Sequence, residues 1–215
     1  MVLTDERKAV LTDRSWLYYQ NVIEVVPYLE MRGISKEIAD VFRLGCVTEG
    51  EFIHRLSIPY LTPSGVVGFK YGCVNLSHGD HKEEGLNCKK YLYEPGVKHQ
   101  LYNAQTLIRA TDVVVITEGE LDAISVEALC DIPAVGYPGA STWTSNGNEY
   151  WPLCFEGIPE VIVIADGDQP GKDAAKAVAQ SIGNTARVVQ LGDGLDANSY
   201  IVDRGVYEFL ERITE

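Results

Sequence analysis

The chain has 215 residues, of which 46% are hydrophobic and 23% are charged. This composition is ordinary for a globular protein and excludes a disordered, collagenous or fibrous chain. Its 18 Lys and Arg against 31 Asp and Glu give a net charge of −13, which argues against a protein whose whole surface attracts nucleic acid. No apolar run approaches the roughly 20 residues that span a bilayer, and no secretory leader is evident. Five cysteines without a CxxC pair favour a reducing cytoplasm over a disulfide framework.

Two halves of the chain differ in pattern, so we expect one domain over residues 1–108 and a second over residues 109–215. The first half opens with a predicted helix over residues 13–23, capped by Asp13. Antiparallel strands follow, and a Pro-Ser-Gly turn at residues 62–65 predicts a β-hairpin.

Basic and aromatic residues alternate along these strands. Arg55, Lys70, Lys89 and Lys90 are interleaved with several tyrosines. Lysine beside tyrosine can combine phosphate contacts with stacking on bases, as in proteins that bind single-stranded nucleic acid. The same pattern is also typical of an ordinary solvated sheet face, so the sequence leaves both interpretations open.

The second half alternates short β-branched runs with helical patterns, which indicates an α/β fold with a parallel sheet. Strands are expected over residues 112–117, 132–136, 160–165 and 186–191. Helices are expected over residues 120–131 and from Lys172 to a stop at Gly183.

Acidic residues follow three of these strands. Glu118 comes after the first, Asp166 and Asp168 after the third, and Asp196 after the fourth. Ligands of open α/β sheets bind at this carboxyl edge, and neighbouring carboxylates repel one another unless a cation joins them. Mg²⁺ or Mn²⁺ suits such oxygen ligands. Asp122, four residues after Glu118, could add a ligand or stabilise a helix start, and separate helix caps remain the alternative for the whole set.

A second group of candidate ligands lies in one polar loop of the first half, with spacings of four, two and six residues. Cys73, His78, His81 and Cys88 could together bind Zn²⁺ tetrahedrally. Their spacing matches no standard zinc finger, so a plain loop is the alternative.

The acidic motifs resemble a known signature. Residues 118–125 read EGELDAIS, and residues 166–171 read DGDQPG, which together resemble the TOPRIM domain of bacterial primases, topoisomerases and nucleases. The resemblance implies a Rossmann-like parallel sheet flanked by helices, with Glu118 as catalytic residue and Asp166 and Asp168 as a catalytic metal motif.

The first half resembles the polymerase core of DnaG-type primases, and the short primases of bacteriophages most of all. The likeness rests on residues 28–35, 42–45, 55–59, 65–69 and 90–92. It implies an N-terminal α+β subdomain beside the TOPRIM domain. Tyr93 and Asn198 depart from the family pattern, since primases usually have Asn and Asp at these places.

The resemblance implies a primase, a nucleotidyltransferase that makes short RNA primers on single-stranded DNA from nucleoside triphosphates. The metal ions would be Mg²⁺ or Mn²⁺, with Asp122 and Asp196 as further ligands. Arg55, Lys70, Lys89 and Lys90 would line the groove for template and triphosphate.

The partners implied are a replicative helicase and a zinc-binding domain on another chain, with no membrane. The location implied is the cytoplasm, that of the bacterial host if a phage encodes the chain. Two alternatives remain: a metal-dependent TOPRIM nuclease, and a catalytically degenerate adaptor for replication or recombination.

Overall fold

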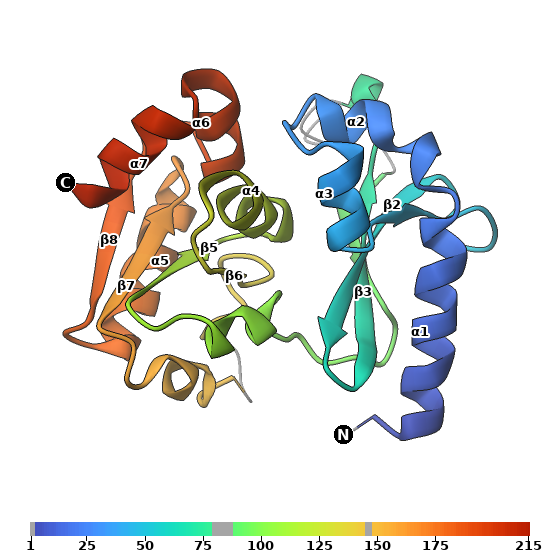
Figure 1. Ribbon diagram of the computed structural model, residues 1–215, viewed down its shortest axis with the longest axis horizontal. Helices are drawn as coiled ribbons and strands as arrows, with labels where there is room; N and C mark the ends of the chain where they lie inside the picture. Colours follow the sequence, from blue (N-terminus) through green and yellow to red (C-terminus); the bar gives the residue numbers. More distant parts are fainter. Residues whose placement is uncertain (1–2, 79–87, 145–147) are drawn as a thin grey trace. The chain divides into compact units, whose positions relative to one another are not determined.

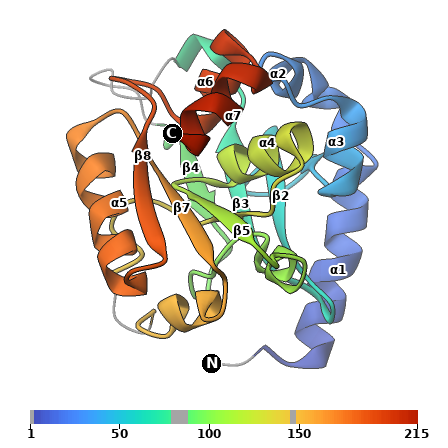
Figure 2. The same ribbon diagram turned by 60° about the vertical axis from the view of Figure 1, so that its left-hand side comes forward.

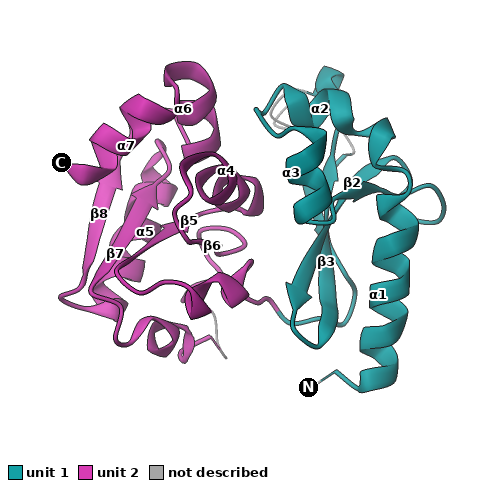
Figure 3. Ribbon diagram, viewed as in Figure 1, with its two compact units in different colours: residues 1–98 teal, residues 99–215 magenta. Residues whose placement is uncertain are grey.

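The computed structural model describes residues 3–78, 88–144 and 148–215. The chain divides into two compact units, Met1–Lys98 and His99–Glu215 (Figure 3). The division falls before residue 99, whereas the sequence predicted it after residue 108. Residues 99–108 go with the second unit because Leu101 is part of its hydrophobic core and Tyr102 forms a β-bridge with Gly136.

The first unit begins with helices. They are α1 (Asp5–Tyr19), η1 (Val22–Glu24), α2 (Val26–Glu30) and α3 (Lys36–Val41). The predicted start of the first helix at Asp13 is wrong. The Thr4 side chain caps α1 by accepting a hydrogen bond from the Arg7 N–H. Leu11, in the middle of α1, is fully buried.

An antiparallel sheet completes this unit, in the order β1-β2-β3-β4. The strands are β1 (Gly45–Cys46), β2 (Arg55–Thr62), β3 (Gly65–Cys73) and β4 (Tyr91–Tyr93), and η2 (Leu76–His78) follows β3. The predicted hairpin is confirmed, with Thr62 opposite Gly65. Helix α1 packs on β3, and Leu11, Tyr18 and Phe69 belong to the core between them (Figure 1).

A buried acid ties α1 to the segment after β4. Glu94 is 4% exposed and accepts hydrogen bonds from Arg7 at 2.7 Å, from Arg14 at 3.0 Å and from the Tyr71 hydroxyl at 2.7 Å. Two cations and one hydroxyl therefore compensate the buried charge, as burial of a carboxylate requires.

The second unit contains a parallel sheet in the order β6-β5-β7-β8. Its strands are β5 (Val113–Thr117), β6 (Ala134–Gly136), β7 (Glu160–Ala165) and β8 (Ala186–Gln190). Its helices are η3 (Ala104–Ile108), α4 (Glu120–Cys130), η4 (Trp151–Phe155), α5 (Gln169–Ile182), α6 (Ala197–Arg204) and α7 (Val206–Thr214).

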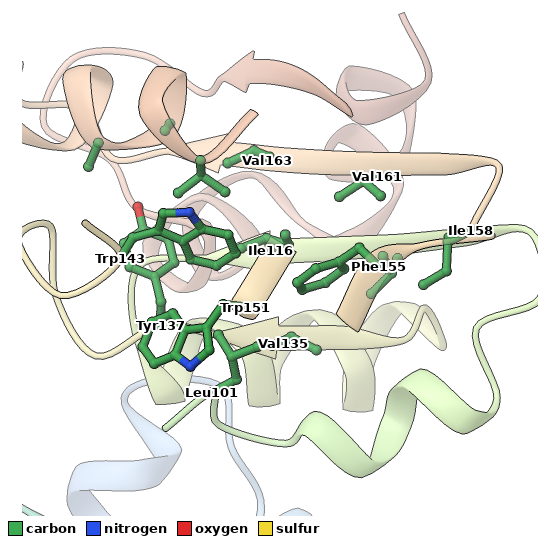
Figure 4. Close-up of a cluster of buried hydrophobic side chains, with 14 of the residues drawn as sticks. Leu101, Ile116, Val135, Tyr137, Trp143, Trp151, Phe155, Ile158, Val161 and Val163 are labelled. Atoms are coloured by element: carbon green, nitrogen blue, oxygen red, sulfur yellow. The ribbon is translucent and has the colours of Figure 1, made fainter. Parts of the chain in front are cut away.

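Helices cover both faces of the parallel sheet, because its strands are apolar on both sides. On one face Ile116 and Val163 pack with Trp151 and Phe155 of η4 and with the apolar side of α5 (Figure 4). Helix α4 lies over the other face and contacts α6 and α7 (Figure 2). The predicted fold class is confirmed: α/β, with a helix-flanked parallel sheet and an N-terminal subdomain built on an antiparallel sheet.

Among the residues that the structure describes, every helix is too short or too polar to cross a membrane.

Candidate metal and catalytic site

The acids named from the sequence lie at the carboxyl ends of three adjacent strands of the parallel sheet. Glu118 follows β5, Asp166 and Asp168 follow β7, and Asp196 lies in the segment between β8 and α6. Since β5, β7 and β8 are neighbours in the sheet, their ends meet at one edge. The structure therefore brings to one edge residues that are up to 78 positions apart in the sequence, from 118 to 196.

Two glycines allow the loops at this edge of the sheet to pack closely together. A Cβ atom on Gly167 would lie 2.2 Å from the backbone nitrogen of Gly194, and a Cβ atom on Gly119 would lie 2.5 Å from Oδ2 of Asp122. Gly167 exchanges backbone hydrogen bonds with the loop after β8, at 2.9 Å to Leu195 and at 3.3 Å to Gly194. The glycines thus let the acidic loops approach more closely than any side chain would permit.

Four of the five acids are each held by one backbone N–H group. The bonds run from Ala140 to Glu118 at 2.9 Å, from Asn198 to Asp122 at 2.9 Å, from Gly171 to Asp168 at 2.8 Å and from Ser199 to Asp196 at 2.7 Å. Asp168 and Asp196 are also the N-caps of α5 and α6. The cap interpretation that the sequence left open is therefore part of the structure, and it fixes where these carboxylates point.

Asp166 is the fifth acid, and its carboxylate makes no hydrogen bond or ion pair within the described part of the chain. Burial, together with the charges of Asp122, Glu118, Asp196 and Asp168 in decreasing order, raises the pKa of Asp166 to about 9. All four of the other predicted metal ligands thus act on this one side chain. Asp166 is the acid on which the charges of the other four act, and its burial among them favours its protonated form when no cation is bound.

The donor set suits a hard divalent cation, since it consists of carboxylate oxygens that repel one another. No three of these acids have oxygens within 4.8 Å of one another; in the described residues only Cys73, His78 and Cys88 have donor atoms that close. The described acids thus do not form a ready three-ligand cluster, and Mg²⁺ or Mn²⁺ would take one or two of them and complete its shell with water.

Tyr137 lies beside the acids and was not identified from the sequence. Its side chain is fully buried, and its hydroxyl makes no hydrogen bond to any described residue. Burial and the charges of Glu118, Asp166 and Asp122 raise the pKa of Tyr137. The residue follows β6 directly, so only the strand order, which places β6 beside β5, could have indicated it.

The basic residues that the sequence placed in a groove belong to the first unit, and they differ in how exposed they are. Lys89 and Lys90 are exposed. Lys70 is only 3% exposed, with Nζ 4.3 Å from the ring centroid of Tyr91 and 5.4 Å from that of Tyr93. The prediction that Lys70 lines a groove does not fit this position, because its ammonium group lies under two tyrosine rings.

Arg55 and the predicted zinc ligands form a separate group, which lies where β3 ends and shortly before β4 begins. The Arg55 guanidinium donates to the Lys89 carbonyl at 2.9 Å and contacts Sγ of Cys88 at 3.3 Å. The structure brings together Cys73, His78 and Cys88. His81, the fourth predicted ligand, lies outside the described residues.

Comparison with known proteins identifies the second unit. The Toprim-like family matches residues 115–201, which include all five acids. The gene 57 protein of Mycobacterium phage D29 is 44% identical over 158 residues, which cover 74% of this chain and 97% of that protein. The chain belongs to the Toprim-domain family. Its Toprim unit carries the five acids at the edge of the parallel sheet.

Primases are among the relatives of this Toprim protein. The DNA primase of Pseudomonas putida is 29% identical over 145 residues, which cover 64% of this chain but only 21% of that primase. A solved DnaG primase catalytic domain bound to single-stranded DNA superimposes with a TM-score of 0.74 at 23% identity, covering 95% of this chain and 77% of that domain. Both units of the Toprim protein therefore share the DnaG catalytic-core fold, and the resemblance inferred from the sequence is confirmed.

Proposed function

We propose that this chain is a DNA primase-type nucleotidyltransferase that synthesises short RNA primers on single-stranded DNA during DNA replication, with phage replication as the setting. The observation that carries the proposal is the edge of the Toprim sheet, where strand ends bring together Glu118, Asp166, Asp168 and Asp196, and where the charges of four acids act on Asp166. The DnaG-core fold of the chain supports primer synthesis over other Toprim reactions.

Glu118, Asp166 and Asp168 are the proposed catalytic residues, and Asp122 and Asp196 complete the proposed metal-binding set. Mg²⁺ or Mn²⁺ bound by these residues would lower the pKa of a primer hydroxyl and stabilise a leaving pyrophosphate. A cation bound there would take the place of a proton on Asp166. The Ala140 N–H orients Glu118, and the Gly171 N–H orients Asp168, so both carboxylates are in place before a ligand arrives.

Nucleic acid and triphosphate would contact the first unit through its exposed cations. Lys89 and Lys90 have ammonium groups accessible to phosphate, and Lys90 lies 5.6 Å from the Tyr91 ring centroid. Arg55 already donates to a backbone carbonyl, and it contributes by positioning Lys89. The net charge of −13 predicts weak binding that declines steeply with salt.

The test uses purified protein, single-stranded DNA, labelled ribonucleotides and Mn²⁺. We expect short labelled RNA products with the wild type. Asp166→Asn and Glu118→Gln should reduce their rate of synthesis about a hundredfold or more, because each change removes several kcal/mol of metal-dependent stabilisation. Asp112→Asn is the matched control, since Asp112 lies at the amino end of β5, away from the acidic edge, and is exposed.

The same reaction separates primer synthesis from the two alternatives. Shortened DNA in place of labelled RNA, lost in Asp166→Asn, would identify a Toprim nuclease. Neither product across a range of templates and Mn²⁺ concentrations would contradict the enzymatic proposal and leave the adaptor role. A replicative helicase and a zinc-binding domain on another chain remain proposed partners, which can be added to the same reaction.

A further inference from the structure

Two thiols and one imidazole gather where β3 ends and the chain returns to β4. Sγ of Cys73 lies 3.4 Å from Nδ1 of His78 and 3.7 Å from Sγ of Cys88, and the three donor atoms lie within 4.8 Å of one another. Each of the three residues is partly buried. This cluster lies in the first unit and shares no residue with the acids of the Toprim unit.

The separations match those that zinc imposes on its ligands. Bonds of about 2.3 Å to sulfur and about 2.0 Å to nitrogen at tetrahedral angles place two sulfurs about 3.8 Å apart and sulfur and nitrogen about 3.5 Å apart. The observed values are 3.7 Å and 3.4 Å. Two cysteines and a histidine are also ligands of the softness that favours zinc over the hard cations of the acidic edge.

The neighbours of the cluster hold these ligands in position. The Asn75 side-chain oxygen accepts from the N–H and the hydroxyl of Ser77, at 3.0 and 2.7 Å, and its nitrogen lies 3.0 Å from Nε2 of His78. The imidazole is thereby held with Nδ1 toward Cys73. Zinc on Nδ1 would leave the ring proton on Nε2, so the Asn75 amide would have to turn over and give up its bonds to Ser77 in order to accept that proton.

Arg55 supplies a positive charge next to Cys88. Its guanidinium lies 3.3 Å from Sγ of Cys88 and donates to the Lys89 carbonyl at 2.9 Å. Two thiolate ligands would balance the charge of one Zn²⁺.

We propose that Cys73, His78 and Cys88 form a zinc site that fastens β4 to the end of β3. The pairing of these strands covers only Lys70 to Gly72 opposite Tyr91 to Tyr93, and β4 itself has three residues. A metal held by both cysteines would join two positions that lie fifteen residues apart in the sequence, 73 and 88. It would fix the strand that carries Tyr91 and follows Lys90. Structural zinc takes four ligands, so one further ligand completes the site.

Zinc content of the full chain tests the proposal without reference to enzymatic activity. The protein is prepared without a histidine tag, exchanged into zinc-containing buffer, desalted and measured by plasma mass spectrometry. We expect about one zinc per chain. Cys73→Ser and Cys88→Ser should lose it, and His78→Ala should weaken zinc binding at least about tenfold. Cys154→Ser is the control, because Cys154 is an exposed cysteine of the Toprim unit and should leave the zinc content unchanged.

A measurement on the wild type avoids any variant that fails to fold. Zinc should slow alkylation of Cys73 and Cys88, read by peptide mass spectrometry, and leave that of Cys154 unchanged. Cobalt in place of zinc should give a thiolate-to-metal absorption band. A wild type that stays metal-free in excess zinc, with Cys73 and Cys88 alkylated at the same rate with and without zinc, would overturn the proposal. A Cys73–Cys88 disulfide, seen as the loss of two hydrogens in the intact mass, would overturn it as well.

Discussion

The backbone N–H of Asn198 donates a 2.9 Å hydrogen bond to Oδ1 of Asp122, 76 residues earlier in the chain. The Asn198 side chain donates a second bond, at 2.7 Å, to the Ser125 hydroxyl. These contacts join the start of α6 to the first turns of α4, and Asp122 is only 8% exposed. Asp122 therefore combines a structural role with its charge beside Asp166.

Two substitutions separate these roles of Asp122. Asp122→Asn keeps an oxygen that can accept from Asn198, so the free energy of unfolding should change by less than about 1 kcal/mol, while Mn²⁺ affinity falls because a charge is lost. Asp122→Ala should also lose the hydrogen bond and cost about 1–3 kcal/mol. Urea unfolding and Mn²⁺ titration measure the two effects. Equal unfolding free energies for the two variants would contradict the structural role.

Asp166 predicts a pH dependence of stability in the metal-free protein. Its pKa is about 9 in the folded chain against 3.8 for an ordinary Asp, so between these values the folded state holds a proton that the unfolded state has released. Stability must then fall as pH rises through this window. Asp166→Asn has no such proton to lose. The melting temperature of this variant, measured relative to that of the wild type, should therefore rise between about pH 5 and about pH 9.

Thermal unfolding in EDTA measures that difference, with Asp112→Asn as the control whose offset from the wild type should not change with pH. A constant offset for Asp166→Asn over the same range would show that the carboxyl is not held in its protonated form.

Lys70 and Lys90 should respond differently to single-stranded DNA, although both lie beside Tyr91. Lys90 is exposed, so Lys90→Met should lower affinity and reduce the slope of log affinity against log salt by about 0.7. Lys70 lies under the rings of Tyr91 and Tyr93, so Lys70→Met should leave the slope unchanged. Fluorescence anisotropy at several salt concentrations makes the comparison, and an equal loss of slope in both variants would refute the assignment.

Much of this architecture could be predicted from short stretches of the sequence. β-Branched runs predicted all four strands of the parallel sheet, and the acids directly after them predicted the edge at which those side chains meet. The predicted strand at 160–165 coincides with β7. These features depend on residues close together in sequence, which is why periodicity and turn residues disclose them.

Other features depend on contacts between distant residues, which no local pattern encodes. The burial of Lys70 follows from the pairing of β3 with β4. The Glu94 side chain accepts hydrogen bonds from Arg7 and Arg14, which lie 87 and 80 residues earlier in the sequence. The start of α1 was misplaced because Asp13 is a good capping residue, yet Thr4 is another and the residues between them favour helix.

Proton release on Mn²⁺ binding tests most directly whether the Toprim acids hold a cation around Asp166. Calorimetric titrations at about pH 7.5 in two buffers of different ionisation enthalpy should show close to one proton released per Mn²⁺ bound, because the cation must displace the proton of Asp166. Asp166→Asn should bind at least about tenfold more weakly and release no proton, while Asp112→Asn should behave as the wild type. Unchanged Mn²⁺ affinity in Asp166→Asn, or binding by the wild type without proton release, would contradict the account.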